Sequence, residues 1–294
     1  MKTITHKLFL SAAILWGTQA QAGTIKVAAS IPDLASIASA IGGSRVETFA
    51  IAKPDANTHS VEVLPSYMVK VARAQVYLKV GVSLDGWADA IIQGSRNSTI
   101  EVADCSKGVS VLEKPTGKVD ASMGDVHPEG NPHYWLDPEN GEFIAHNIAQ
   151  ALERVDPAGS SVYEAGLAKF LQDLKAHRAQ WNARMAPLKG AAIFTYHSSW
   201  PYFAKAFGLR IVGKVEPVPG IPTNARHLQE LLDIAKAEHV KILLQEPYFP
   251  RDGGEFLHKQ ASIKPLVLAP SCKGVGASDY FAHFDELVQA MVGG

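Results

Sequence analysis

The sequence has only two cysteines, Cys105 and Cys272, among 294 residues. Two thiols cannot supply a multi-cysteine zinc cluster, so a transition-metal site in this chain must use other side chains. An oxidising compartment would permit a disulfide between them, but their separation along the chain does not decide the pairing. Ellman titration of the denatured protein would distinguish bonded from free thiols.

Long apolar runs are confined to the N-terminus. Lys2 and Lys7 form a positively charged start, residues 8–17 are apolar, and the small-residue motif AQA (20–22) is typical of a cleavage site. This pattern predicts a secretory signal peptide over residues 1–22, too short for a stable membrane anchor. No later stretch approaches the roughly 20 apolar residues of a membrane helix. We therefore expect an exported, soluble, periplasmic chain, and without a cysteine near the cleavage site we expect no lipid anchor.

An excess of charge of one sign is also missing. The expected mature chain begins at Gly23 and loses two lysines and no acids, so 26 of the 28 basic residues oppose 29 acidic ones, a net charge of −3. That balance gives no electrostatic basis for binding nucleic acid or an anionic membrane. The 272 residues that remain of 294 exceed what one core usually organises, so two domains are expected.

The sequence does contain a regular alternation of strand and helix patterns. Segment 24–43 predicts an apolar strand, a turn at Pro32 and an amphipathic helix that ends at Gly42-Gly43. Further strand patterns lie at 46–51, 75–81, 99–105, 191–197, 210–216, 240–246 and 265–270. Further helical patterns lie at 64–74, 84–92, 199–207 and 223–238, from Asp137-Pro138 to about Val155, and from about Asp279. This alternation favours βαβ units and parallel sheets.

One helical pattern, at 160–188, is much longer than the others and would extend about 40 Å. It separates two sets of alternating strands and helices. We therefore predict an α/β fold of two lobes, each with a mainly parallel sheet flanked by helices, joined by one long helix with a cleft between the lobes. The expected boundaries are an N-terminal lobe over 23–156, a linking helix over 157–188 and a C-terminal lobe over 189–294.

Four polar residues stand where the ligands of open α/β sheets bind, beyond the carboxyl ends of the strands. His59 and His133 lie in loops of the N-terminal lobe, and His197 and Glu246 directly end two strands of the C-terminal lobe. Three imidazoles and one carboxylate match a tetrahedral metal site. The residues are 74, 64 and 49 positions apart. Such a site forms only in the folded protein and couples metal binding to closure of the lobes.

Each of these residues also has a structural interpretation. A histidine at a strand end is often a hydrogen-bonded structural residue, and Glu246 could cap a loop or pair with Arg251. Cys272 could be a soft fourth ligand, although a small buried thiol without a ligand role is the more common case. We expect most of the remaining histidines to be solvated: His127, His146, His177, His227, His239, His258 and His283.

Six blocks of the sequence together resemble one family. They are VAASIPDLASIASAIGG, DANTHSVEVLPSYM, AQVYLKVGVSLDGWADAI, NPHYWLDPENGEFIAHNIAQAL, TYHSSWPYFAKAFGL and HVKILLQEPYF. In this order they are similar to the zinc/manganese class of periplasmic solute-binding proteins that feed ABC importers, over nearly the whole mature chain. The resemblance implies two α/β lobes joined by one rigid long helix. It also implies that His59, His133 and His197 bind the metal.

The sequence departs from the family pattern at the fourth ligand. Many members place an aspartate shortly after the last strand, whereas LAPSCKGVG (268–276) has no acid before Asp279. We therefore predict Glu246 as the fourth ligand, with water or Cys272 as alternatives.

A second departure concerns the loop at 114–132. Typical zinc members carry many histidines and acids there, but this chain offers only four such residues, Asp120, Asp125, His127 and Glu129. Accessory metal capture should therefore be weak, with His127 a candidate to pass metal to His133.

The ligand types favour zinc. Neutral imidazoles suit Zn²⁺, Cu²⁺ or Ni²⁺ better than Mn²⁺, which prefers carboxylates. We predict a monomer without enzymatic activity that captures Zn²⁺, with Mn²⁺ less favoured, and delivers it to an ABC permease in the inner membrane. Tyr134, Trp135 and Trp200 would exclude water from the bound ion.

Two other functions stay open at this point. A zinc hydrolase would use Glu246 as general base beside a metal-bound water, but neither HExxH nor a nucleophile elbow is present. A metallochaperone or adhesin without a transporter would use the same site.

Overall fold

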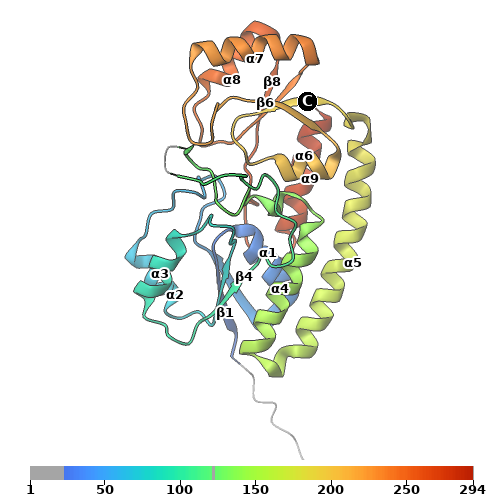
Figure 1. The fold of residues 1–294 in the computed structure, drawn as a ribbon. Helices are drawn as coiled ribbons and strands as arrows, with labels where there is room; N and C mark the ends of the chain where they lie inside the picture. The colour runs from blue at the N-terminus through green and yellow to red at the C-terminus, as the bar shows by residue number, and fades with distance from the viewer. Residues whose placement is uncertain (1–22, 121–122, 294) are drawn as a thin grey trace, which may run out of the picture.

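Two parallel four-stranded sheets organise the protein in the computed structural model, which describes residues 23–120 and 123–293 (Figure 1). The first sheet has the order β2-β1-β3-β4 and the second the order β6-β5-β7-β8. All neighbouring strands are parallel. In each sheet the strand order reverses beside the first strand, and this is where open α/β sheets bind ligands. The predicted signal peptide lies outside the described residues.

The strands are short, and most lie within the predicted ranges. Those of the first sheet are β1 (Ile25–Ala29), β2 (Val46–Ala50), β3 (Val76–Lys79) and β4 (Glu101–Asp104). Those of the second sheet are β5 (Ala192–Thr195), β6 (Arg210–Lys214), β7 (Ile242–Gln245) and β8 (Lys264–Val267).

The helices of the N-terminal lobe are α1 (Pro32–Gly42), α2 (Pro65–Val71), α3 (Trp87–Ser95) and α4 (Asn140–Val155). Helices α1 and α2 both begin with proline. Proline has no backbone N–H, but at the first helical position that group would make no hydrogen bond within the helix. Helix α1 packs against α4, α5, α9 and β2, and apolar side chains therefore surround it.

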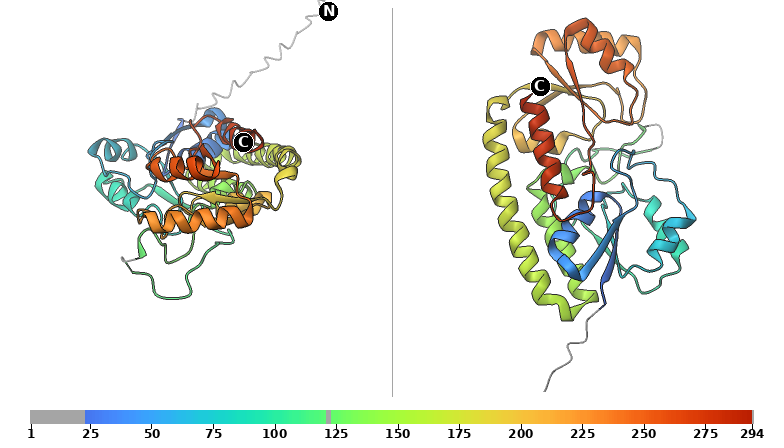
Figure 2. Two further views of the ribbon diagram at one scale, coloured as in Figure 1. Left: turned by 90° about the horizontal axis from the view of Figure 1, so that it is seen from above. Right: turned by 180° about the vertical axis from the view of Figure 1, so that it is seen from behind.

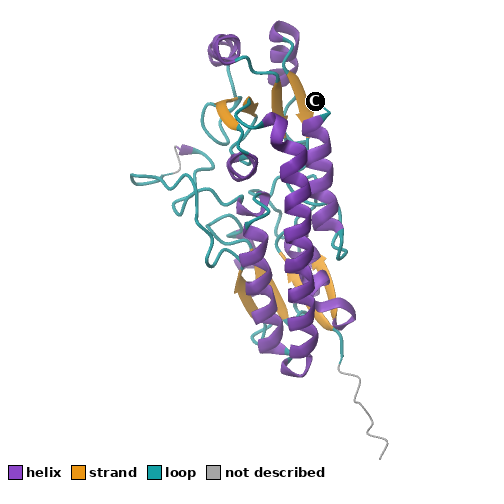
Figure 3. Ribbon diagram, turned by 90° about the vertical axis from the view of Figure 1, so that its right-hand side faces the viewer, coloured by secondary structure: helices purple, strands orange, loops and turns teal. Residues whose placement is uncertain are grey.

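The long helix α5 (Ser160–Met185) runs along one side of the molecule and joins the two lobes (Figure 3). Short 3-10 turns at Pro157–Gly159 and Ala186–Leu188 extend it at both ends. At about 1.5 Å per residue its 26 residues span about 39 Å. The predicted fold class, two α/β lobes joined by one long helix, is confirmed.

The last helix, α9 (Asp279–Val292), lies beside α5 and reaches back to α1 (Figure 2). Trp181 Nε1 on α5 donates to Asp285 Oδ1 at 2.7 Å, and the Tyr280 backbone N–H donates to Ser36 Oγ on α1 at 2.9 Å. The C-terminal segment therefore contacts the N-terminal lobe directly. The domain boundaries given above stay a prediction.

Two predictions about helices were wrong in detail. Helix α8 (Asp252–Ala261) was not foreseen, because its Gly253-Gly254 pair looks like a turn. It is the crossover that parallel strands β7 and β8 require. Helix α4 begins at Asn140, not at Asp137-Pro138, because a 3-10 turn at Tyr134–Leu136 precedes it. The other helices of the C-terminal lobe are α6 (Pro201–Phe207) and α7 (Ala225–Glu238).

One large apolar core spans both lobes, and a smaller apolar cluster lies within each lobe. The large core includes Val27 of the first sheet, Leu244 of the second, and Trp135, Trp181 and Phe284 between them. Shared burial of this kind resists large rotations of one lobe against the other. Among the described residues, no helix is both long and apolar enough to cross a membrane.

Candidate metal centre

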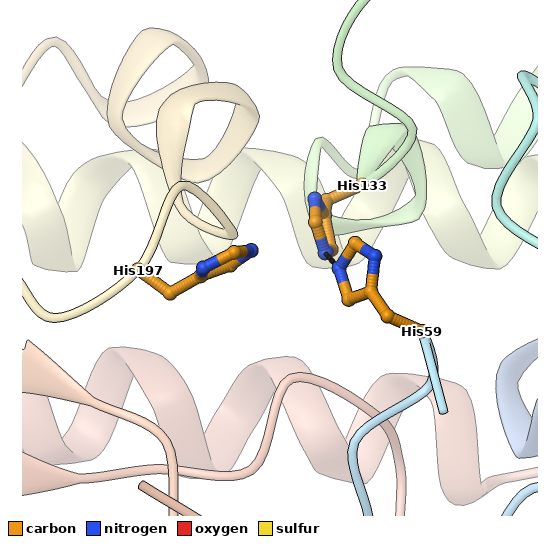
Figure 4. Close-up of side chains that lie close together, drawn as sticks. All are labelled: His59, His133 and His197. Atoms are coloured by element: carbon orange, nitrogen blue, oxygen red, sulfur yellow. Dashed lines mark hydrogen bonds between the residues drawn. The ribbon is translucent and has the colours of Figure 1, made fainter. Parts of the chain in front are cut away.

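His59 lies in the loop after β2, in a backbone turn that its neighbours hold. The Asn57 side-chain oxygen accepts the His59 backbone N–H at 2.9 Å, as in an Asx turn. Trp87 Nε1 donates to the Thr58 carbonyl at 2.9 Å. These two bonds orient the loop and direct the His59 ring between the lobes (Figure 4).

His133 immediately precedes the 3-10 turn before α4 and is almost completely buried. Asn131 Oδ1 accepts from both the backbone N–H and Nδ1 of His133, each at 3.0 Å. Nδ1 therefore carries the proton, and Nε2 is left as the nitrogen with a free lone pair.

His197 lies two residues after the end of β5 and is also buried. Its Nδ1 donates to Glu216 Oε2 at 2.6 Å, and this buried carboxylate lies just after β6. A carboxylate in this position fixes the tautomer and orientation of a metal-binding imidazole. Glu216 was not predicted as a site residue, because the sequence pattern placed it at the end of a strand.

The three histidines converge between the lobes, with one ring nitrogen of each within 4.8 Å of the others (Figure 4). His59 Nε2 and His133 Nε2 are 3.2 Å apart. The opposite nitrogens of His59, His133 and His197 contact His127, Asn131 and Glu216, respectively. The Nε2 atoms are therefore the ones left to bind a shared ion.

The imidazoles of His59 and His133 are held neutral. Burial is the largest cause that lowers the pKa of each ring well below the ordinary value, and the neighbouring histidines lower it further. A neutral imidazole offers its lone pair to a metal ion without first losing a proton.

Glu246 directly follows β7 and is completely buried, but it does not belong to the group formed by the three histidines. Neither carboxyl oxygen has a hydrogen-bond partner, and among the described residues no ion pair joins it to Arg251. Burial raises its pKa, and the nearby His197 ring and Ser199 side chain oppose that shift. A buried carboxyl group with both oxygens unpartnered is rare in proteins and calls for an explanation.

Both cysteines are free and buried. Cys272 Sγ donates to the Gly274 carbonyl at 3.2 Å, and burial raises the thiol pKa of both residues. Cys272 lies outside the histidine group.

Among the other histidines, His146, His239 and His258 are exposed, as expected. The expectation is wrong for His283, a residue of α9 that is buried. This burial is the main cause that lowers its pKa to about 4. His127 is half-buried: its Nε2 lies 3.1 Å from His59 Nδ1, and its Nδ1 lies 3.1 Å from the Ser83 carbonyl oxygen.

Aromatic side chains enclose the site. Tyr134, Trp135 and Trp200, predicted to exclude water, are all buried, and the Trp135 ring lies 5.2 Å from that of His133. Phe249, which no sequence pattern indicated, packs with its ring centroid 5.4 Å from that of His197. A cavity of about 200 Å³ opens beside His133 and His197 and has Glu113, Asp125 and Lys214 in its walls.

Comparison with known proteins decides the family. Residues 27–294 match the family model described as zinc-uptake complex component A, periplasmic. The chain belongs to this family. It is therefore a periplasmic, divalent-metal-binding component of ABC-type uptake and not an enzyme, and the hydrolase alternative is set aside.

Individual relatives are more distant. The chain is 25% identical over 281 residues to the high-affinity zinc uptake system protein ZnuA of Brucella abortus (strain 2308), covering 83% of this chain and 84% of that protein. It is 27% identical to the manganese ABC transporter substrate-binding lipoprotein PsaA of Streptococcus pneumoniae, covering 71% and 70%. A crystal structure of ZnuA superposes with a TM-score of 0.79 at 24% identity, covering 92% of this chain and 98% of that one, and supports the fold.

Proposed function

We propose that the ion carried by this protein is zinc. The donor set supports this: three imidazoles, those of His133 and His197 buried and that of His59 half-buried, present Nε2 atoms to one point, and among the described residues no carboxylate oxygen lies within that group. Nitrogen-rich tetrahedral sites favour zinc, whereas manganese favours oxygen ligands in octahedral geometry. A relative named for zinc and another named for manganese are about equally similar to the chain, so the choice of metal rests on the ligands.

The fourth ligand in this proposal is Glu246. Its support is the buried carboxyl group, which has no hydrogen-bond partner among the described residues and lies in the neighbourhood of His197. The cation would supply the missing partner for that carboxylate and lower its pKa. Water is the alternative ligand. Cys272 is less well suited, because its Sγ already donates to a backbone carbonyl.

Capture and release would follow from the position of the ligands. His59 and His133 belong to the N-terminal lobe, and His197 and Glu246 to the C-terminal lobe. The monomer would bind zinc between the lobes, under the aromatic side chains, and a permease in the inner membrane would separate the lobes to release it.

Elemental analysis of the purified mature protein, followed by competitive titration with Zn²⁺ and Mn²⁺, tests this function. We expect one zinc per chain and tighter binding of Zn²⁺ than of Mn²⁺. Tighter binding of Mn²⁺ would overturn the proposed specificity. Deletion of the gene should impair growth in chelated medium, and added zinc should restore it.

A further inference from the structure

Two loops from opposite lobes meet at the rim of the metal-site cavity. One comprises residues 123–127 of the N-terminal lobe and the other residues 216–221 of the C-terminal lobe, and we call them the loop pair. The Asp125 backbone N–H donates to the Pro219 carbonyl at 2.9 Å. Asp125 and Pro219 both line the cavity that also contains His133 and His197.

The loops approach so closely that glycine is required. A Cβ atom on Gly124, whose φ is +66°, would lie 2.0 Å from the Pro219 carbonyl oxygen. Gly220, with φ +78°, packs against the Asp125 carboxylate in the same way. Both positions use the left-handed backbone conformation that glycine adopts at little cost.

Each loop is also joined to a predicted metal ligand. His127, at the end of the first loop, contacts Nδ1 of His59. In the second loop, Glu216 Oε2 accepts from both Nδ1 of His197, at 2.6 Å, and the Gly220 backbone N–H, at 3.0 Å. One carboxylate oxygen thus joins a ligand imidazole to the turn that contacts the opposite lobe.

We propose that Glu216 is a positioning residue that couples His197 to the loop pair, so that contact between the loops slows metal release. The proposal rests on the proposed metal-binding function. While the loops touch, Gly220 holds the carboxylate and the carboxylate holds the His197 ring with Nε2 toward the ion. When the loops separate, the ring loses this restraint, and the ion can leave.

Four variants of the mature protein test the coupling. Gly124→Ala separates the loops without altering a ligand or Glu216, and Glu216→Ala removes the link itself. Glu216→Gln keeps one acceptor oxygen. Gly190→Ala is the matched control, because Gly190 also has a positive φ (+84°) but, its chain neighbours aside, no atom of the described residues lies within 4 Å of the added methyl group.

The first measurement is the rate at which Zn²⁺ passes to an excess of a chromophoric chelator. Loss of a residue that supports a metal ligand typically weakens binding roughly 10- to 100-fold, and we expect release from Glu216→Ala to be faster by that factor. Gly124→Ala should also release Zn²⁺ faster than Gly190→Ala. Glu216→Gln should release it at a rate between those of Glu216→Ala and the wild type. The double variant Gly124→Ala/Glu216→Ala should release no faster than Glu216→Ala alone. The proposal would be overturned if the two substitutions together increased the release rate by the product of their separate effects. It would also be overturned if Gly124→Ala released Zn²⁺ at the same rate as Gly190→Ala.

The absorption spectrum of the Co²⁺-loaded protein separates positioning from general destabilisation. It should shift in Glu216→Ala, where the His197 ring is reoriented, shift in the same direction but less in Gly124→Ala, and stay unchanged in Gly190→Ala. An unshifted spectrum in Glu216→Ala would contradict a positioning role.

Amide hydrogen exchange tests the same link without metal. The Asp125 amide should exchange faster in Glu216→Ala than in the wild type, and unchanged exchange would argue against coupling. If the wild type bound no metal, the proposed function would fail, and this exchange measurement would still decide whether Glu216 holds the loops together.

Discussion

Nε2 of His59 and Nε2 of His133 lie 3.2 Å apart, although the residues are 74 positions apart in the sequence. Two nitrogens bound to one tetrahedral zinc ion, each at about 2.0–2.1 Å, are separated by about 3.3 Å. The N-terminal lobe therefore already holds one edge of a tetrahedron. His197 completes a face from the opposite lobe.

Replacing His133 with alanine should weaken zinc binding by more than the roughly 100-fold upper range for residues that only support a ligand. The substitution removes Nε2 of His133, one of the two nitrogens that the N-terminal lobe already holds at the spacing of zinc ligands. Competition calorimetry measures the affinity, with His146→Ala, an exposed change on α4, as control. Equal affinity of the two variants would refute the assignment of His133 as a ligand.

Glu246→Gln keeps the size of the side chain and removes its charge. If Glu246 is the fourth ligand, zinc affinity should fall by at least about tenfold, and X-ray absorption at the zinc edge should show a changed coordination shell. Unchanged affinity and coordination would instead identify water as the fourth ligand.

Asn131 connects the lobes through the ring of His133. Its Oδ1 accepts from His133, while its Nδ2 donates to the Ser198 carbonyl at 2.7 Å. Asn131→Ala should therefore lower zinc affinity roughly 10- to 100-fold by releasing both the ring and the opposite loop. Titration beside Asn147→Ala, a change remote from the site, measures the effect, and matching affinities would rule out this role.

Asp33 should make stability depend on pH. It is fully buried in the first turn of α1, and burial raises its pKa from 3.8 to about 7. Between about pH 4 and 7 the unfolded chain has released this proton and the folded protein retains it, so the Asp33 contribution to the free energy of unfolding falls as pH rises.

Asp33→Asn should remove this part of the dependence of the free energy of unfolding on pH. At pH 8 it should raise that free energy by up to about 4 kcal/mol, since one pKa unit corresponds to about 1.4 kcal/mol. Urea unfolding at pH 5 and pH 8 measures the effect. Asp233→Asn, an exposed change on α7, is the control. A slope identical to that of the wild type would show that Asp33 ionises normally.

Gly166 sets the distance between α5 and α1. A Cβ atom there would lie 2.0 Å from the Ile41 carbonyl oxygen, so Gly166→Ala must push the two helices apart. We expect a loss of about 1–3 kcal/mol in the free energy of unfolding, measured by urea unfolding. Gln172→Ala, on the exposed face of α5, should change it by less than about 0.5 kcal/mol.

The fold was predictable because its signals are local. Apolar runs and helical spacing placed most of the strands and the long helix, since each pattern reflects burial of one face of its own segment. Helix α8 was missed because two glycines weaken its pattern, although the parallel pairing of β7 and β8 demands a crossover there. The return of α9 to α1 has no local signal and depends on packing across the chain.

The site divides in the same way. The sequence alone predicted His59, His133, His197 and Glu246 as ligands, because residue type and position at strand ends carry the information. Only the tertiary structure showed that the three histidines converge, that Glu246 has no hydrogen-bond partner in the part of the chain the structure describes, and that Glu216 holds His197. These facts are distances between residues remote in sequence, and packing of the two lobes sets them. The residue types were therefore determined locally, and their geometry was decided by the assembled core.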